Sequence, residues 1–390
     1  LGMVMPLSEF LSVRYSYRTV FLGGVLAVGV CSLGCACSVN FPMLIAFRFL
    51  KGVAGGLVIP CTMAMLYRYV PKYLQASYLG NTVLFQSVGV AVGPTLAGFL
   101  LQISSWHVLF LFNLPLVCLA FLFGKQSIPR ETGDQRDPID FFGMLQVTVG
   151  TGFVMIAFTE ADTWGWHSIL FLSCFAIGLL LVITFILRQL HTARPLLNFA
   201  VLKYKPFTLA LLIQCTLAMT LGITAILVQI YCQTVRGYTP AETGMFLLVP
   251  SIMMLVGNSV ANMLHKRVKA RWLITGGLLL AFLGNLGLCR VQLDSAIVLL
   301  VASFSLRYLG MGMMQMPLTN YGLSSVPQEL SGHASSMFNW GKQLTQVVSM
   351  NILTVLLSFH LRRYYLAAGN TGVPQTGTMA YNLAATQAVG

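Results

Sequence analysis

The stretch GVAVGPTLAGFL, residues 89–100, lies inside an apolar run that is long enough to cross a bilayer. It contains three glycines and a proline, the residues that most weaken a helix interior. Gly89, Gly93 and Ala97 recur every fourth residue, so one helix face carries almost no side-chain bulk and can approach another helix closely. Pro94 removes an internal hydrogen bond and bends the helix. The stretch predicts a close, bent contact between two transmembrane helices.

The whole chain has the composition of a membrane protein with many spans. Of its 390 residues, 57% are hydrophobic and 8% are charged, and the mean hydropathy is +0.79. No water-soluble domain carries that much apolar surface. Apolar runs of about 20 residues predict eleven complete spans and an all-α fold. These spans cover 19–38, 43–66, 78–102, 107–124, 141–160, 167–187, 207–228, 243–263, 272–290, 296–318 and 334–357.

Basic residues are distributed as a topology signal. Fifteen of the 23 Lys and Arg residues fall on one set of alternate connections, four fall on the opposite set and four lie within spans. The set with fifteen marks the cytoplasmic side of a multi-pass protein of the cell (inner or plasma) membrane. Topology therefore explains the net charge of +13, and nucleic acid is excluded as a partner.

Motifs for catalysis and metal binding are missing from the sequence. The nine cysteines lie almost entirely in apolar runs, without a CxxC pair or a histidine at metal spacing. No HExxH, GxSxG or Walker-type loop occurs. We expect no metal, no cofactor and no enzymatic activity.

Two stretches suggest an internal duplication. RFLKGVAGGLVIP (48–60) and RYLGMGMMQMP (307–317) both run from Arg, an aromatic residue and Leu through a glycine-rich helix to Pro. Counting spans from the two arginines places one span before residue 1 and one after residue 390. The spans at 141–160 and 167–187 then form an insert between two bundles. Because position 1 is Leu and residues 1–12 look like the tail of a span, we expect the sequence to be a fragment.

Seven stretches, in order, resemble the fourteen-span drug:proton antiporters of the major facilitator superfamily, the EmrB/QacA subfamily. They are RFLKGVAGGLVIP, GVAVGPTLAGFL, WHVLFLFNLP (106–115), DPIDFFG (137–143), RPLLNFAVLK (194–203), GYTPAETGMFLLVP (237–250) and PQELSGHASSMFNWGKQL (327–344). The resemblance implies a major facilitator fold with two six-helix bundles and two inserted central helices, here without the first and last helices.

The expected division of the chain follows from this resemblance. We expect five parts in chain order. They are an incomplete N-terminal bundle (1–124), a cytoplasmic connector (125–140), two inserted spans (141–187), a second connector (188–206) and an incomplete C-terminal bundle (207–390). The resemblance also identifies Gly89, Gly93, Pro94 and Gly98 as the hinge motif that distinguishes exporters from importers. The alternative is that these small residues pack helices as in any membrane bundle.

The chain departs from the family in its cytoplasmic gate loop. The family pattern is close to GxLADRxGRR, and the matching stretch is SEFLSVRYSYR, residues 8–18. Ser8 and Ser16 replace the glycines, and Val13 replaces the acidic residue. The basic residues that persist are Arg14 and Arg18, while Gln75 stands where a basic residue is expected. These changes weaken the inner charge network that the resemblance implies.

Three cations lie inside predicted spans. At 1.5 Å per residue, Arg48 lies about 8 Å deep, Lys51 one turn deeper and Arg307 about 16 Å deep, near the midplane. A cation in hydrocarbon costs at least about 2.5–3.5 kcal/mol, so these side chains should face water or an anionic partner. They either line a transport path or bond to backbone carbonyls as structural cations.

No acidic residue accompanies these cations at the midplane. All ten acids lie in or near loops or span ends. We expect the proton-carrying acid in an absent first span, facing Arg48.

A polar stripe marks the last span. Asn339, Lys342, Gln343 and Gln346 recur at helical spacing and must turn inward. The stripe either joins Gln315 in a substrate cavity or makes hydrogen bonds between helices.

The function that these patterns favour is proton-coupled efflux of small amphipathic or drug-like molecules by alternating access. Proton coupling and the drug class come from the resemblance. The expected partners are the substrate, protons and the lipid bilayer, and the sequence leaves open whether a periplasmic or outer-membrane adaptor takes part. Two alternatives stay open: export of an organic anion or metabolite, and a degenerate sensor or scaffold that transports nothing, suggested by Val13 and Gln75.

Overall fold

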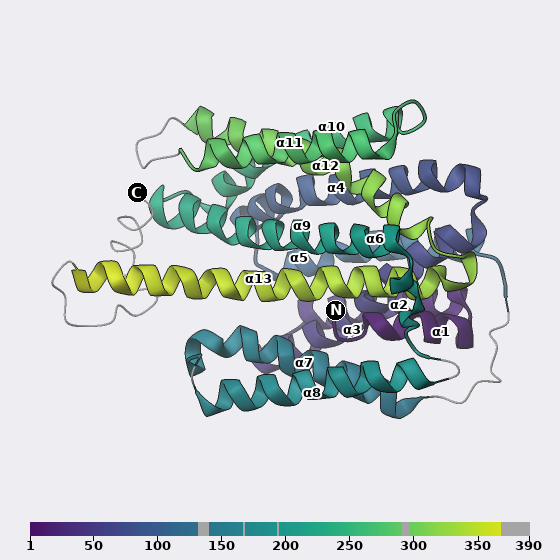
Figure 1. The fold of residues 1–390 in the computed structure, drawn as a ribbon. Helices are drawn as coiled ribbons and strands as arrows, with labels where there is room; N and C mark the ends of the chain where they lie inside the picture. Colours follow the sequence, from purple (N-terminus) through teal and green to yellow (C-terminus); the bar gives the residue numbers. More distant parts are fainter. Residues whose placement is uncertain (132–139, 167, 193–194, 291–296, 368–390) are drawn as a thin grey trace. The chain divides into compact units, whose positions relative to one another are not determined.

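The computed structural model describes residues 1–131, 140–166, 168–192, 195–290 and 297–367, and Figure 1 draws the other residues in grey. Every regular element in these ranges is helical, which confirms the expected all-α fold. In chain order the helices are η1 (Met5–Leu7), α1 (Ser8–Tyr15), α2 (Tyr17–Ala36), α3 (Phe41–Tyr69), α4 (Lys72–Ile103), α5 (His107–Leu111), α6 (Asn113–Ser127), α7 (Phe141–Trp164), α8 (Ile169–His191), η2 (Phe199–Lys203), α9 (Lys205–Ile230), η3 (Tyr231–Val235), α10 (Pro240–Leu264), α11 (Ala270–Leu288), α12 (Ile297–Leu323), η4 (Gln328–Leu330) and α13 (Ser331–Ala367).

Ten of the eleven predicted spans coincide with helices that are long and apolar enough to cross a membrane. The span predicted at 107–124 is divided into α5 and α6 at Phe112, although together they still have the length of one crossing. The eleventh prediction, 334–357, lies within the 37-residue helix α13. This span stays a prediction, because many side chains of its second half lie outside the described residues.

The N-terminal end consists of short helical segments. Residues 1–12, expected to be the tail of a span, contain η1 and the start of the eight-residue helix α1, and that expectation remains a prediction. Pro6 occupies the first turn of η1, and α1 ends at Tyr15, because the backbone of the next residue, Ser16, leaves the helical region. The stretch expected as a cytoplasmic loop is therefore largely helical.

The described chain forms two compact units. Unit 1 comprises Leu1–Gln75, Ile103–Cys215 and Tyr321–Val347, and unit 2 comprises Ala76–Gln102, Thr216–Asn320 and Val348–Gly390. Helices α4, α9, α12 and α13 each contribute to both units. The bundle and connector boundaries expected from the sequence remain a prediction.

Unit 1 is built from neighbouring helix pairs. Helix α2 packs against α3 and α6, and α7 packs along α8 (Figure 1). Aromatic side chains fill the end of the α7–α8 pair, where Phe158 meets Trp166, Phe171 and Phe175 at centroid distances of 5.6–6.2 Å. Edge-to-face contacts of this kind add stability beyond the buried area.

Unit 2 depends on glycines between α10, α11 and α12. A Cβ atom added to Gly277 of α11 would lie 2.6 Å from the Gly310 carbonyl oxygen of α12. One added to Gly284 would lie 2.6 Å from the backbone nitrogen of Arg307, and Gly257 of α10 meets the backbone of α12 equally closely. Small residues let transmembrane backbones approach one another, and van der Waals packing then holds the helices together.

Adjacent glycines on α11 provide a test of this packing. Gly277→Ala forces a Cβ against the backbone of α12 and should lower the free energy of unfolding by about 1–3 kcal/mol, as overpacking does. Gly276→Ala is the matched control, because its Cβ would lie 3.7 Å from the nearest atom, the Met313 Cε. Helix propensity should leave that variant unchanged or up to about 1 kcal/mol more stable. Thermal unfolding in detergent measures both, and equal midpoints would contradict the close approach.

Candidate functional site

Arg307 is the most deeply buried of the described cations of unit 2, with 1% of its surface exposed. Its guanidinium donates to the Thr224 hydroxyl and, at 2.7 Å, to the Thr220 carbonyl, both on α9. The Nε atom has no hydrogen-bond partner among the described residues. Gly284 of α11 leaves room for the Arg307 backbone to approach. The depth of Arg307 in the membrane remains a prediction.

The charge of Arg307 lacks a carboxylate partner in the described part of the chain. The described acid of unit 2 is Glu242, whose carboxylate accepts the Thr239 N–H at 2.8 Å in a capping box at the start of α10. Threonine oxygens satisfy part of the guanidinium but carry no negative charge. In general, a buried cation needs further hydrogen bonds, an opposite charge or water to be stable.

Arg48 and Lys51 of α3 lie together in unit 1. Both cations sit over the ring of Phe110 in α5, with the Arg48 Cζ 5.1 Å and the Lys51 Nζ 5.4 Å from the ring centroid. Arg48 is exposed and Lys51 is half-buried. Cation–π attraction needs no carboxylate. Sequence reasoning missed Phe110, although it lies inside a stretch that carries the family resemblance.

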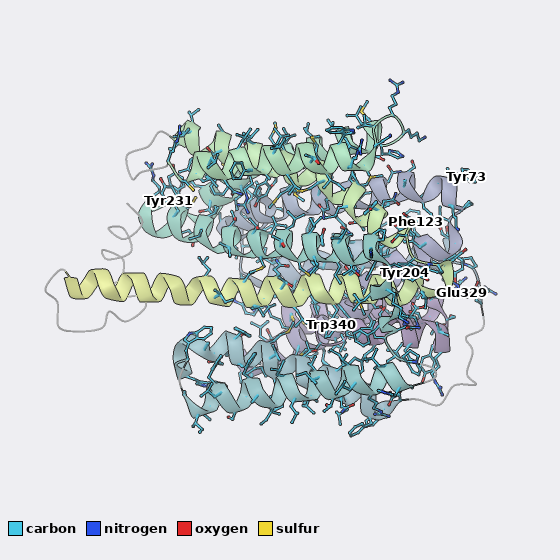
Figure 2. All side chains as sticks on the ribbon, in the orientation of Figure 1. Tyr73, Phe123, Tyr204, Tyr231, Glu329 and Trp340 are labelled. Atoms are coloured by element: carbon cyan, nitrogen blue, oxygen red, sulfur yellow. The ribbon has the colours of Figure 1, made fainter. Side chains whose placement is uncertain are left out.

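The polar stripe of α13 also lies in unit 1 and is half-buried. Asn339 donates to the Ser335 carbonyl of its own helix at 2.9 Å. On the same helix, a Cβ added to Gly341 would lie 3.1 Å from the Leu211 side chain of α9. Trp340, labelled on α13 in Figure 2, is buried beside the stripe. The role of the stripe, in a substrate cavity or in hydrogen bonds between helices, remains a prediction.

The predicted pathway residues fall into three groups. Arg48 and Lys51 meet over one ring, and the α13 stripe forms a second group of unit 1. Arg307 and Gln315 belong to α12 in unit 2, where the Gln315 side-chain oxygen is buried without a partner among the described residues. One cavity shared by all of them remains a prediction.

The predicted hinge motif lies on α4, which is helical throughout. Gly89 and Gly93 are exposed, and a Cβ added to either meets no described atom within 4 Å. Gly98 is buried. The side chain of Pro94 lies outside the described residues. The close contact at this face and the bend remain predictions.

Polar links join α4 to α10 within unit 2. The Thr95 hydroxyl donates to the Gly244 carbonyl at 2.9 Å, and the Asn262 amide donates to Asn81 at 3.3 Å. Between them the buried Asn258 donates to Ser87. Sequence reasoning did not select Asn258, although an amide in the middle of an apolar span is a usable signal.

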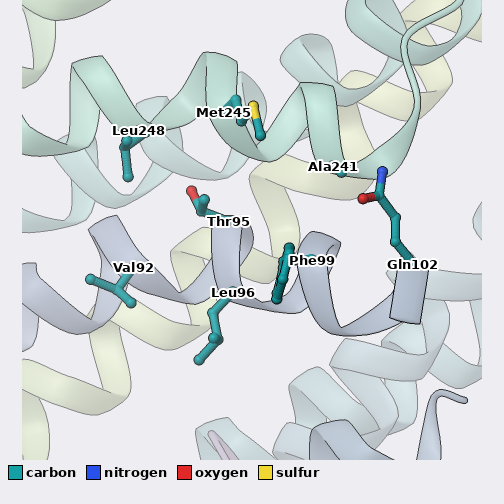
Figure 3. A pocket seen from close by; sticks show the side chains of 8 residues that line it. All are labelled: Val92, Thr95, Leu96, Phe99, Gln102, Ala241, Met245 and Leu248. Atoms are coloured by element: carbon teal, nitrogen blue, oxygen red, sulfur yellow. The ribbon is translucent and has the colours of Figure 1, made fainter. Parts of the chain in front are cut away.

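A cavity of 290 Å³ opens between α4 and α10 (Figure 3). Apolar side chains form most of its wall, and Thr95 and Gln102 are its polar members. The full lining is Val92, Thr95, Leu96, Phe99, Gln102, Ala241, Met245 and Leu248. A small apolar cavity with few polar groups is typical of sites for small molecules.

The gate-loop residues make contacts at the end of unit 1. Arg18 donates to the carbonyls of Ile128 and Lys125, at 2.7 and 2.6 Å, and so ties α2 to the end of α6. The Arg14 guanidinium lies 5.8 Å from the centroid of the Tyr15 ring. Val13 is 39% exposed.

Gln75 donates hydrogen bonds to carbonyl groups at the end of α3. Its side-chain amide is buried and donates to the carbonyls of Tyr67, at 3.1 Å, and Val70, at 2.9 Å. These are carbonyls of the last turn, which basic side chains often satisfy. Gln75 therefore makes the hydrogen bonds that a basic residue could make here.

Ser16 has a backbone conformation that favours glycine. Its φ is +78° and its ψ is 145°, and no other non-glycine residue in the described part of the chain has a positive φ. The family resemblance places a glycine at this position. The Ser16 side chain accepts the Thr19 N–H at 3.2 Å and caps α2, so the serine offers a hydrogen bond in place of conformational freedom.

Two substitutions at Ser16 separate strain from capping. Ser16→Gly removes strain of about 1–3 kcal/mol and loses a few tenths in capping, so it should raise the unfolding temperature. Ser16→Ala keeps the strain and loses about 1 kcal/mol of capping, so it should lower that temperature. Thermal unfolding in detergent orders the three proteins. If the protein with Ser16 unfolds at a higher temperature than the Ser16→Gly variant, this turn is not strained.

A sequence profile described as Major Facilitator Superfamily matches residues 1–350. The lincomycin resistance protein LmrB of Listeria monocytogenes is 26% identical over 375 residues, which is 96% of this chain and 80% of that protein. The tetracenomycin C resistance and export protein of Streptomyces glaucescens is 26% identical over 347 residues, or 88% of this chain and 64% of that protein. Both relatives are named for resistance to a drug.

A solved structure has the same fold. The human organic anion transporter MFSD10 (TETRAN) superimposes with a TM-score of 0.64 at 11% sequence identity, over 100% of this chain and 78% of the other. FucP, a transporter solved in its outward conformation, gives a TM-score of 0.52 at 14% identity, over 99% of this chain and 84% of the other. At these identities the likeness concerns the fold alone.

Proposed function

Because the chain belongs to the Major Facilitator Superfamily and is a membrane transporter rather than an enzyme, we propose that it exports small amphipathic or drug-like molecules. We further propose that protons entering by the same alternating-access cycle drive this export. The transporter lies in the cell membrane, with the ends that carry most basic residues in the cytoplasm. The resemblance to the fourteen-span EmrB/QacA subfamily supports the exchange with protons.

The apolar cavity between α4 and α10 is the observation that supports the proposed substrate class. Its 290 Å³ suits the hydrophobic part of a drug-like molecule rather than a sugar, which needs many polar partners. It lies on the helix that contains the hinge motif. Relatives named for drug resistance support the same class of cargo.

The pathway assignments made from the sequence form part of the proposal. The cations and the polar stripe contact substrate, the glycine- and proline-rich segment of α4 acts as a hinge, and two arginines act at the cytoplasmic gate. The pathway residues are Arg48, Lys51, Arg307, Gln315, Asn339, Lys342, Gln343 and Gln346, the hinge is Gly89, Gly93, Pro94 and Gly98, and the gate residues are Arg14 and Arg18.

Cavity substitutions test the substrate class. Phe99→Ala removes the largest apolar wall of the cavity and should slow ethidium efflux from cells about tenfold, the effect of losing one or two kcal/mol of contact. Phe123→Ala is the control, because Phe123 is an exposed phenylalanine of α6 in the other unit (Figure 2). Surface expression must be equal in both. Efflux that is unchanged in Phe99→Ala would remove the cavity from the substrate path.

Export of an organic anion is the second candidate, favoured by the burial of Arg307 without a carboxylate. On this reading carboxyfluorescein leaves cells faster than ethidium, and Arg307→Gln slows its efflux about tenfold or more, as expected when one charge-assisted contact is lost. Arg290→Gln, at an exposed position after α11, is the control.

If both dyes leave at the rate of cells without the protein, the chain acts as the non-transporting sensor or scaffold. Gln75 is one of the two departures that suggested this alternative. Its side chain nevertheless makes hydrogen bonds to carbonyls at the end of α3.

A further inference from the structure

Three buried hydroxyl groups on α7 and α13 are not used by the pathway assignments. Thr148 and Thr151 belong to α7, and Ser336 belongs to α13. Thr151 has 0% and Ser336 has 1% of its surface exposed, and the Thr148 hydroxyl oxygen is buried. These three open hydroxyls have no hydrogen-bond partner among the described residues. The indole Nε1 atom of Trp340, one turn beyond Ser336, is buried and unpartnered in the same part of the chain (Figure 2).

Other threonines of the same two helices bond to their own backbone. Thr159 of α7 donates to the Met155 carbonyl at 2.8 Å, and Thr345 of α13 donates to the Gly341 carbonyl at 2.7 Å. A bond to the carbonyl four residues earlier satisfies a hydroxyl without help from another helix. The open hydroxyls make no such bond, so their partner must come from outside their own helix.

The first residues of the chain bring α7 and α13 together within unit 1. A Cβ added to the buried Gly2 would lie 2.5 Å from the Met155 Cε atom of α7 and 3.1 Å from the Gln343 Cγ atom of α13. A Cβ added to Gly152 of α7 would likewise lie 2.5 Å from the Met3 Cε atom. The two methionines thus occupy space that two glycines leave. Because Gln343 belongs to the polar stripe, α7 borders that stripe at this level.

A second meeting point lies at the N-terminal ends of both helices. The Leu196 Cδ1 atom would lie 2.9 Å from a Cβ added to Gly143 of α7. The backbone of the same residue contacts the His333 ring of α13. Leu196 itself has 0% of its surface exposed. Because the starts of both helices meet one residue, α7 and α13 run in the same direction between the two meeting points.

On α7 the open hydroxyls lie on the face that contacts Gly2. Thr148 and Thr151 precede Met155 by seven and four residues, which is about two turns and one turn of an α-helix. Residues at these spacings share one face of a helix. Both hydroxyls therefore lie between the Gly2 and Leu196 levels.

Helix α13 repeats this spacing. Ser336 and Trp340 precede Gln343 by seven and three residues. At 1.5 Å per residue, Ser336 lies about 10 Å before Gln343 along its helix, and Thr148 lies about the same distance before Met155. The open groups of the two helices therefore lie at matching levels in the interior of unit 1.

The chemistry of these groups suits water. Buried polar atoms without a protein partner are generally bonded to ordered water, which makes about three hydrogen bonds. Hydroxyl and indole groups carry no charge, so they suit a neutral ligand with donors and acceptors better than an ion.

We propose that an internal water site lies between α7 and α13, held by the Thr148, Thr151 and Ser336 hydroxyls and by the Trp340 N–H group. Helix α7, predicted as part of the insert, then borders the same hydrated interior as the polar stripe of α13. The part that this water plays in a transport cycle rests on the proposed function, but the site itself does not.

Hydroxyl-radical footprinting tests the site without measuring transport. Brief X-ray pulses generate radicals from water, and a bound water oxidises the side chain that it touches. Thr151→Val replaces the hydroxyl by a methyl group, and Ser336→Ala removes a hydroxyl on the other helix. In each variant the oxidation rate of Trp340, measured by mass spectrometry, should fall about fivefold, which corresponds to one net hydrogen bond. Thr345→Val is the matched control and should leave the rate unchanged, because that hydroxyl bonds to its own helix.

Thermal unfolding in detergent gives an independent answer, because the sign of the change differs. In a hydrated site, Thr151→Val loses a hydrogen bond to water and lowers the unfolding temperature. In a dry site, the same change removes an unsatisfied hydroxyl and raises that temperature. Thr159→Val is the control on α7, since its hydroxyl is exposed and bonds to its own helix.

Two results would overturn the water site. One is a Trp340 oxidation rate that is the same in Thr151→Val, in Ser336→Ala and in the unsubstituted protein. The other is a raised unfolding temperature in Thr151→Val. Absent dye flux together with slower oxidation in both variants would reject the proposed function alone, and dye flux together with unaltered oxidation would reject the water site alone.

Discussion

A charge inside an apolar helical protein is stable only where a hydrogen bond, an opposite charge or water meets it, and this constraint organises the structure. Arg307 meets two threonines of α9, and Glu9 meets a tyrosine of α2. In both places a glycine of another helix, Gly284 or Gly332, leaves the room that the charged residue occupies. Each of these two charged residues thus packs against a glycine, where no side chain occupies the space.

Neither charge is fully compensated by the residues that the structure describes. The Nε atom of Arg307 and the Oε2 atom of Glu9 are both buried without a partner there. A protein that served only as a scaffold would gain stability from replacing such groups with apolar ones. Buried polar atoms without a protein partner are positions where a bound water or ion is expected.

The sequence predicts the parts of this account that depend on local pattern. Apolar runs predict ten helices that the structure confirms as long and apolar enough to cross a membrane. The close approach of Glu9 and Gly332 could not be predicted from the sequence, because the two residues are distant in the chain and no spacing rule connects them. Ser16 could be identified from the glycine expected at its position, whereas the bonds of Gln75 depend on where α3 ends and α4 begins.

Coupled movement of protons and substrate is the measurement that tests the account most directly. The chain is reconstituted into vesicles with pyranine inside, and ethidium or carboxyfluorescein is added with and without a pH gradient. The account predicts that a gradient drives dye uphill and that added dye moves protons in the opposite direction, with both fluxes lost in Arg307→Gln. Dye that crosses at the same rate under either gradient, without a change in pyranine fluorescence, would contradict it.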